Sequence, residues 1–232
     1  MVKDSCMKIL SFDVGIKNLS YCTLDENKRI KNWGILNLDE SPQCSMCLKK
    51  PCEKQASYSV ERNGETCYYC TSHIKHKSLG KLFKKKKLNT SRDMMNLSQI
   101  CIKNLKTLNL EDISSVLIEN QPALKNPVMK SIQMIIYTFF IIEGVMKESS
   151  NINSVHMINA RNKLKVYKGE PVSIPFKNDK KNRYKINKFL SVEYTKNMIE
   201  NESDEIKNIY NLSKKKDDLA DSYLQGIYWL EK

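Results

Sequence analysis

The stretch ILSFDVGIKN, residues 9–18, decides the fold because an apolar run in it ends abruptly in a charge. Ile9, Leu10 and Phe12 form the run, which is typical of a buried strand. Asp13 follows, just before Val14 and Gly15. An aspartate before glycine is an ordinary turn former, but it is also where a strand presents a carboxylate at the rim of a sheet. The rest of the chain has to decide between these readings.

Around this strand, hydrophobic spacing and turn residues predict alternating strands and helices. Strands are expected at residues 8–15, 18–25, 30–38, 115–120 and 153–160. Helices are expected from about residue 91 to 108, then at 128–146, 181–199 and 217–232, with a loop at 161–179. The order predicts an α/β fold, in which a central mixed five-stranded sheet is flanked by helices. We expect one domain over residues 1–232, interrupted by a small insertion at residues 40–77.

Composition points to a polyanionic partner. The formal net charge is +13, and 39 basic residues outnumber 26 acidic ones. Such an excess suits nucleic acid. Lysine exceeds arginine 34 to 5, which an A/T-rich genome would also produce, so charge alone leaves both readings open.

Two features bear on the compartment. No apolar N-terminal segment with a cleavage site is present, so we expect an intracellular protein without a signal peptide. The most apolar run, residues 131–146, is short for a bilayer and contains Gln133 and Glu143. We therefore interpret it as a buried helix and expect no membrane partner.

Four carboxylates stand out from this pattern. Asp13 and Glu119 each end an apolar strand, while Asp218 and Asp221 lie three residues apart on one face of the last helix. Asp217 points about 100° away from that face. Carboxylates from three elements repel one another unless cations lie between them, and oxygen ligands in this number suit Mg²⁺ or Mn²⁺. Singly, each has an ordinary alternative as a turn former, a strand-end charge or a helix-dipole partner.

Three segments carry a family resemblance: FDVGIKNLSY (12–21), IENQP (118–122) and DDLADSYLQG (217–226). They resemble the acidic motifs of Holliday junction resolvases of the RuvC type, within the ribonuclease H-like superfamily, and most closely those of poxviruses and related large DNA viruses. The resemblance covers residues 8–39 and 91–232. It implies a ribonuclease H-like fold in which Asp13, Glu119, Asp218 and Asp221 are the catalytic metal ligands.

The resemblance also implies an activity. We expect a homodimeric, Mg²⁺-dependent endonuclease, with two ions per active site, that nicks opposed strands of four-way DNA junctions in viral recombination or replication. If the source is a virus, the host cytoplasm or a viral replication site is the expected location. The unusually apolar helix around Ile135, Phe139 and Ile142 is a candidate for part of the dimer surface. The alternatives are a ribonuclease H-type nuclease on RNA:DNA hybrids and a non-catalytic, zinc-containing DNA-binding protein.

Basic residues near the three motifs are the candidates for DNA binding. An ordinary solvated surface explains most lysines equally well, and the run before the last motif is the best placed. The candidates are Lys17, Lys125, Lys130, Lys181, Arg183, Lys185, Lys214, Lys215 and Lys216.

The insertion is defined by cysteines rather than by apolar periodicity. Two Cys-x-x-Cys pairs, 44/47 and 67/70, are separated by residues 48–66, a spacing typical of a small zinc module. We expect one structural zinc per chain, bound in the first instance by Cys44, Cys47, Cys70 and His73. Cys52 and Cys67 are the alternatives. Whether the module contacts DNA stays open.

Overall fold

The computed structural model describes residues 7–39, 41–46, 50–76, 84–88, 93–124, 126–177 and 180–232. The chain forms two compact units: the first unit comprises Met1–Leu38 and Ser98–Lys232, and the second unit comprises Asp39–Leu97. Cys47, a predicted zinc ligand, and Lys125, a predicted DNA-binding residue, lie outside the described residues.

A five-stranded mixed sheet forms the centre of the first unit, in the order β3-β2-β1-β7-β8. β1 (Lys8–Asp13), β2 (Leu19–Asp25) and β3 (Ile30–Leu36) form an antiparallel meander. β7 (Ile113–Glu119) runs parallel to β1, and β8 (Ser154–Ile158) runs parallel to β7. The mixed five-stranded sheet predicted from the sequence is confirmed.

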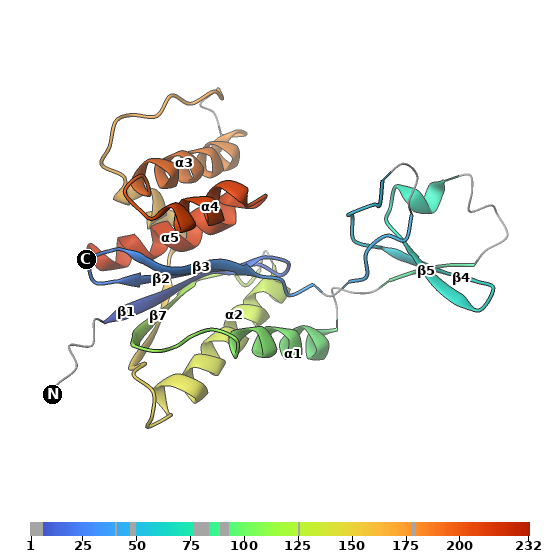
Figure 1. Ribbon diagram of the computed structural model, residues 1–232, viewed down its shortest axis with the longest axis horizontal. Helices are drawn as coiled ribbons and strands as arrows, with labels where there is room; N and C mark the ends of the chain where they lie inside the picture. The colour runs from blue at the N-terminus through green and yellow to red at the C-terminus, as the bar shows by residue number, and fades with distance from the viewer. Residues whose placement is uncertain are drawn as a thin grey trace. The chain divides into compact units, whose positions relative to one another are not determined.

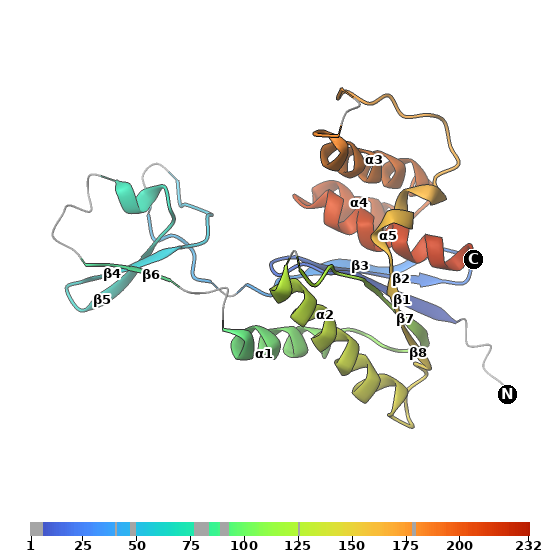
Figure 2. The ribbon, with the colours of Figure 1, turned by 180° about the vertical axis from the view of Figure 1, so that it is seen from behind.

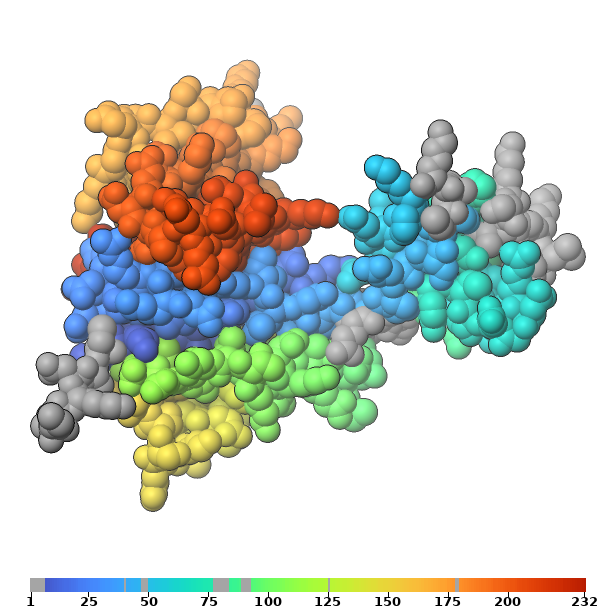
Figure 3. Space-filling view, viewed as in Figure 1, coloured from blue at the N-terminus to red at the C-terminus, as the bar shows by residue number. Residues whose placement is uncertain are grey.

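Helices cover both faces of this sheet (Figures 1 and 2). α1 (Met94–Leu105) and α2 (Pro127–Phe140) lie on one face, and α2 continues as a π-helical turn, Ile141–Val145. α3 (Arg183–Met198), α4 (Asp204–Leu212) and α5 (Lys216–Leu230) lie on the other face. In the space-filling view the blue N-terminal strands lie between these two layers (Figure 3). α4 is a helix that the sequence analysis does not predict.

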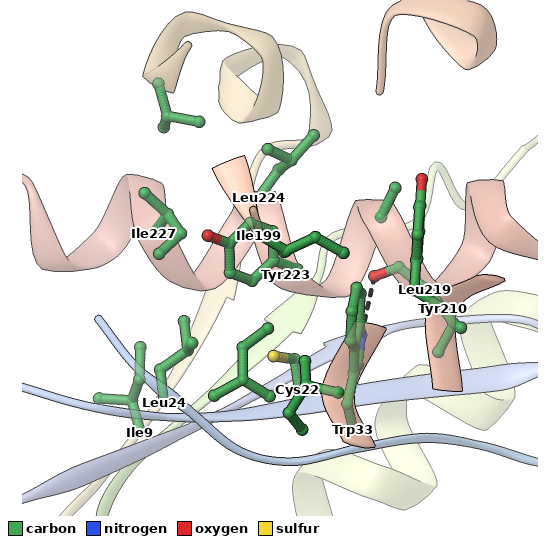
Figure 4. Close-up of a cluster of buried hydrophobic side chains, with 14 of the residues drawn as sticks. Ile9, Cys22, Leu24, Trp33, Ile199, Tyr210, Leu219, Tyr223, Leu224 and Ile227 are labelled. Carbon is green, nitrogen blue, oxygen red and sulfur yellow. Dashed lines mark hydrogen bonds between the residues drawn. The ribbon is translucent and has the colours of Figure 1, made fainter. Parts of the chain in front are cut away.

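The hydrophobic core fixes α5 over the strands of the meander (Figure 4). The Trp33 indole stacks on the Tyr210 ring with centroids 5.3 Å apart, and its Nε1 donates a hydrogen bond to the Leu219 carbonyl at 3.1 Å. Gly226 allows close contact, because a Cβ at this position would lie only 2.6 Å from Leu24 Cδ1. α5 is therefore held at a fixed height above the sheet, and its N-terminal turns are positioned by this packing.

α2 accounts for the most apolar segment. Pro127–Val145 is the one helix of the described chain that is long and apolar enough to cross a membrane by length and composition, with 33% of its most apolar window buried. Its inner face packs on β7 and buries Ile132, Ile136 and Phe140. Core packing of this kind accounts for the apolar inner face, while Met134 and Ile142 of the outer face are exposed.

The second unit contains a three-stranded antiparallel sheet in the order β5-β4-β6. β4 (Tyr58–Arg62) and β5 (Glu65–Tyr69) form a hairpin whose turn, Asn63-Gly64, has positive φ at both residues. This is the preferred Asn-Gly turn for a two-residue hairpin. β6 (Lys85–Lys87) pairs with β4, so the unit extends beyond residue 77, where the sequence analysis ends the insertion.

Candidate active site

Two of the predicted carboxylates meet because their strands are parallel neighbours. Phe12 of β1 pairs with Ile118 of β7, so the next residues, Asp13 and Glu119, end the two strands at the same edge of the sheet. Their side chains are 13% and 14% exposed. Gln121 fixes the glutamate, because its Nε2 donates to Glu119 Oε2 at 2.8 Å. The expectation that strand ends bring these two side chains together agrees with the geometry.

α5 brings the other two predicted carboxylates to the same place. Asp218 and Asp221 line one cleft of about 490 Å³ together with Asp13 and Glu119. Asp217 instead pairs with Lys188 of α3. The helical spacing thus separates Asp217 from its two neighbours, as the sequence analysis expects.

Lys163 is a central residue of this site that sequence reasoning missed. Its ammonium lies 2.9 Å from Asp13 Oδ1, and 3.3 Å from both Glu119 Oε1 and Asp221 Oδ2. The side chain is only 5% exposed. It sits on a 3₁₀ segment, Ala160–Val166, where the sequence analysis expects a loop. The segment has no apolar period, so no sequence signal marks this lysine among its many neighbours.

Burial and mutual repulsion shift the acid–base properties of the cluster. Burial, with the charge of Asp13 close by, raises the pKa of Glu119 to about 8. Burial also raises the pKa of Asp221 to about 6, although Lys163 opposes the shift. Burial acts in the same direction on Asp13, but Lys163 and a hydrogen bond from Glu119 outweigh it and lower its pKa. The pKa of Lys163 is raised, because the three carboxylates outweigh its burial.

The donor set fits a hard divalent cation. Four carboxyl groups face one buried ammonium in this cleft, so the cluster carries excess negative charge when it is deprotonated. Carboxylate oxygens without sulfur or imidazole are the ligands that Mg²⁺ and Mn²⁺ prefer. The arrangement can therefore bind divalent ions at the sheet edge and present them to a phosphate.

The wall of the cleft is basic. Lys17 and Lys215, two of the predicted DNA-binding residues, line it. Tyr184 and Lys188 also line it, and both lie in the basic 180–188 segment that the sequence suggests for DNA binding. Arg161 lines it as well, and the sequence did not mark this residue. An acidic floor beneath a basic wall is suited to a phosphodiester backbone, because the wall attracts the anion that the floor alone would repel.

The remaining basic candidates lie in various settings. Lys130 of α2 donates to Asn120 Oδ1 at 3.1 Å and to Gln133 Oε1 at 3.2 Å, beside the end of β7. Lys214, just before α5, is exposed, and Lys216 is half-buried. The three basic candidates at the start of α3 are also exposed: Lys181, Arg183 and Lys185.

A second cluster lies in the second unit. The ligand atoms of Cys44, Cys52, Cys70 and His73 all lie within 4.8 Å of one another. Cys67 is not part of this group, and Cys52 joins it in addition to three of the four residues that the sequence analysis favours. Burial opposes ionisation of Cys70, but the backbone amides of His73 and Ser72 outweigh it and lower the pKa of its thiol. This cluster of three thiols and one imidazole can hold a metal ion.

Comparison with known proteins gives the family. No family model matches the chain. The uncharacterized protein L451 of Acanthamoeba polyphaga mimivirus is 30% identical over 311 residues, covering 97% of the chain and 75% of that protein. The chain belongs to the L451 family. The L451 family thus includes a mimivirus protein, and the name of that protein states no activity.

A solved structure gives the fold. The yeast mitochondrial Holliday junction resolvase Ydc2 matches with a TM-score of 0.54 at 17% identity, covering 97% of this chain and 79% of that one. At this identity the likeness shows a shared fold, so this member of the L451 family has a resolvase-type α/β fold. The narrower resemblance to poxvirus resolvases stays a prediction.

Proposed function

We propose that the protein is a Holliday junction resolvase: a Mg²⁺-dependent endonuclease that nicks opposed strands of four-way DNA junctions. One observation carries the proposal. Asp13, Glu119, Asp218 and Asp221, from three separate elements, line one basic-walled cleft on a fold shared with a Holliday junction resolvase. A DNA-binding protein without catalysis would gain nothing from four carboxyl groups facing its ligand, because they repel phosphate.

The residues of the cleft have two proposed roles: the carboxylates would bind metal ions, and the lysines would bind phosphates. Divalent ions, two per site, would supply an activated water and stabilise the negative charge that builds on the phosphate and the leaving oxygen. Asp13 interacts electrostatically with Glu119 and with both aspartates of the α5 pair, so it is the ligand best placed to be shared. Lys17 and Lys215 would hold the phosphates that flank the scissile bond, because they line the wall of the same cleft.

Lys163 is assigned a positioning role in this proposal. Its ammonium contacts one oxygen of each of three carboxylates, and so it holds Asp13, Glu119 and Asp221 around one point. A buried cation at the centre offsets the repulsion that would otherwise push the three side chains apart. The lysine therefore holds the cluster in a geometry that can bind divalent ions.

The proposal includes a homodimer, since symmetric nicking of opposed strands requires two active sites related by a twofold axis. An apolar groove of about 400 Å³ between α1 and α2 supports it, lined by Ile102, Met134, Ile135, Phe139 and Ile142. Ile142 is 56% exposed, and contiguous exposed apolar surface is typical of an interface. Light scattering with and without junction DNA tests this part, and a monomer in both cases would contradict it.

The proposal also covers the setting. An intracellular role in viral DNA recombination or replication is supported by the mimivirus relative and by the net charge of +13. One structural zinc per chain is part of the same proposal, supported by the cysteine and histidine cluster of the second unit.

The experiment that tests the function compares substrates. Wild-type protein is incubated with a labelled four-way junction, a plain duplex of the same sequence and an RNA:DNA hybrid, each with Mg²⁺ and with EDTA. We expect cleavage of the four-way junction in Mg²⁺, no cleavage of it in EDTA, and no cleavage of the other two substrates. Cleavage of the hybrid in preference to the junction would replace the proposal with a ribonuclease H-type activity, and no cleavage of any substrate would favour a binding protein.

A further inference from the structure

Among its described residues, the second unit brings together four potential metal ligands, of which Cys52 is not in the set that the sequence spacing favours. Cys44, Cys52, Cys70 and His73 converge so that their ligand atoms all lie within 4.8 Å of one another. Cys44 Sγ lies 3.4 Å from His73 Nδ1. A tetrahedral zinc ion with bonds of about 2.0–2.3 Å separates its ligands by roughly 3.5–3.8 Å. The side chains are therefore spaced as zinc ligands are.

Backbone hydrogen bonds bring the four residues together. The amide of Cys44 donates to the Lys54 carbonyl at 2.9 Å, and the amide of Cys52 donates to the Met46 carbonyl at 3.1 Å. These two bonds place Cys44 and Cys52 side by side. Cys70 follows β5, and a turn closed by Ile74 N donating to the Cys70 carbonyl at 3.0 Å brings His73 back beside it. Two local arrangements thus each supply two ligands.

Cys67 is excluded from the site by strand geometry. It lies within β5 and pairs with Val60 of β4, and the strand stays extended as far as Tyr69. An extended chain advances about 3.4 Å per residue, so residues three apart are separated by roughly 10 Å. A Cys-x-x-Cys pair chelates one ion only when a tight turn folds it back. The spacing of Cys67 and Cys70 therefore resembles a ligand pair without forming one.

The cluster also makes up much of the interior of its unit. The buried core of the second unit is Cys44, Val60, Tyr69, Cys70 and Ile74, and two of these five are ligands. A core of this size cannot offset the chain entropy of folding by hydrophobic burial alone. Small units of this kind commonly fold around the metal.

We infer that the second unit binds one zinc ion through Cys44, Cys52, Cys70 and His73, that Cys67 is not a ligand, and that this zinc holds the second unit folded. The inference does not depend on nuclease activity. The first unit has a separate and larger hydrophobic core around Trp33 and α5, so zinc removal should act on the second unit alone.

The test compares two half-buried cysteines, each changed in the whole chain. Cys52 and Cys67 are both half-buried. Elemental analysis of wild-type protein purified without chelator should give about one zinc per chain. Cys52→Ser should lower this to near zero, and the matched Cys67→Ser should leave it unchanged. Zinc-free wild-type protein, or zinc lost from Cys67→Ser and kept in Cys52→Ser, would overturn the inference.

Cys47 is tested in the same way, since Cys47→Ser should keep its zinc. Loss of zinc from Cys47→Ser with retention in Cys52→Ser would overturn the ligand set.

A second measurement uses wild-type protein, so that it holds even where Cys52→Ser fails to fold. Native protein is treated briefly with iodoacetamide, and each cysteine is quantified by mass spectrometry. Zinc-bound thiolates are shielded, so Cys52 should react at least about tenfold more slowly than Cys67. Equal rates for the two would contradict the inference. Hydrogen exchange after chelation should then rise in peptides of residues 50–76, and stay unchanged in peptides of β1 and β7.

Discussion

The two clusters of this protein are built in opposite ways. In the first unit the carboxylates lie at the ends of β1 and β7 and on α5, at the edge of a sheet whose hydrophobic core includes none of them. In the second unit Cys44 and Cys70 are themselves part of the core. The carboxylates of the first unit repel one another, and the hydrophobic core that stabilises this unit does not include them. In the second unit, the proposed metal ligands are part of the core that stabilises the fold. Losing a ligand should therefore remove chemistry in one unit and structure in the other.

The largest expected effect concerns Asp13, and it sharpens this contrast. Asp13→Asn should lower single-turnover junction cleavage by on the order of 10³-fold or more, because no nearby group replaces a ligand that positions the ions. In a gel shift the variant should still bind the junction. Without Mg²⁺ it should bind more strongly than wild type, since it lacks one negative charge near the phosphate. Glu119→Gln and Asp221→Asn should behave alike.

Asp217→Asn is the matched control for these variants. Asp217 adjoins Asp218 on α5, but it pairs with Lys188 instead of joining the cluster, so cleavage should stay near the wild-type rate. An Asp13→Asn protein that cuts junctions within about tenfold of wild type would show that this aspartate is not a metal ligand. By contrast, Cys70→Ser should reduce the folding of the second unit.

The next largest effect concerns how strongly the stability of the first unit depends on the balance of charge in the carboxylate cluster. Lys163→Met should lower the free energy of unfolding in EDTA by about 3 kcal/mol, because removing one partner leaves three buried carboxylates uncompensated. Saturating Mg²⁺ should recover part of the loss, since divalent ions bring the same carboxylates together. Lys165→Met is the control, because Lys165 is exposed on the same 3₁₀ segment.

Denaturant unfolding monitored by tryptophan fluorescence measures both variants. If Lys163→Met and Lys165→Met lost equally little stability, Lys163 would not be the residue that offsets the repulsion within the cluster.

Much of this site follows from the sequence, for identifiable reasons. Asp13 and Glu119 were predictable because a charge that ends an apolar strand has to lie at the sheet edge. Asp218 and Asp221 were predictable from helical spacing. Lys163 was not, because its segment has no period, and its place in the cluster depends on where the chain goes after β8.

In the second unit the sequence suggested a metal site but left its ligands open. The spacing favoured Cys44, Cys47, Cys70 and His73, with Cys52 and Cys67 as alternatives. The described geometry brings in Cys52 through the backbone bonds of residues 44–46 with 52–54, and leaves Cys67 on an extended strand. Sequence spacing could suggest a metal, but the pairing of distant backbone segments decides which residues meet.

The smallest expected effect is a pH dependence of Mg²⁺ binding by the carboxylate cluster of the first unit. The pKa of Glu119 is raised to about 8, so below that pH it retains a proton that a divalent ion must displace, whereas Asp221, with a pKa of about 6, takes up a proton only near the lower end of the range. Mg²⁺ affinity should therefore weaken as pH falls from 8 to 6, by up to about tenfold per unit for the Glu119 proton. Calorimetry in two buffers of different ionisation enthalpy should also detect proton release on binding. An affinity independent of pH over this range would contradict the shifted pKa values.

The most direct test of the central claim uses a supercoiled plasmid that extrudes a cruciform, which presents a four-way junction to the enzyme. Two nicks on opposed strands, made within one encounter, convert the plasmid directly to the linear form, whereas a single nick gives an open circle. With Mg²⁺, wild-type protein should yield linear product whose ends map to the junction and can be religated, and Asp221→Asn should yield none. Open circles alone, or linear product undiminished in Asp221→Asn, would contradict the assignment of this carboxylate cleft as the active site of a junction resolvase.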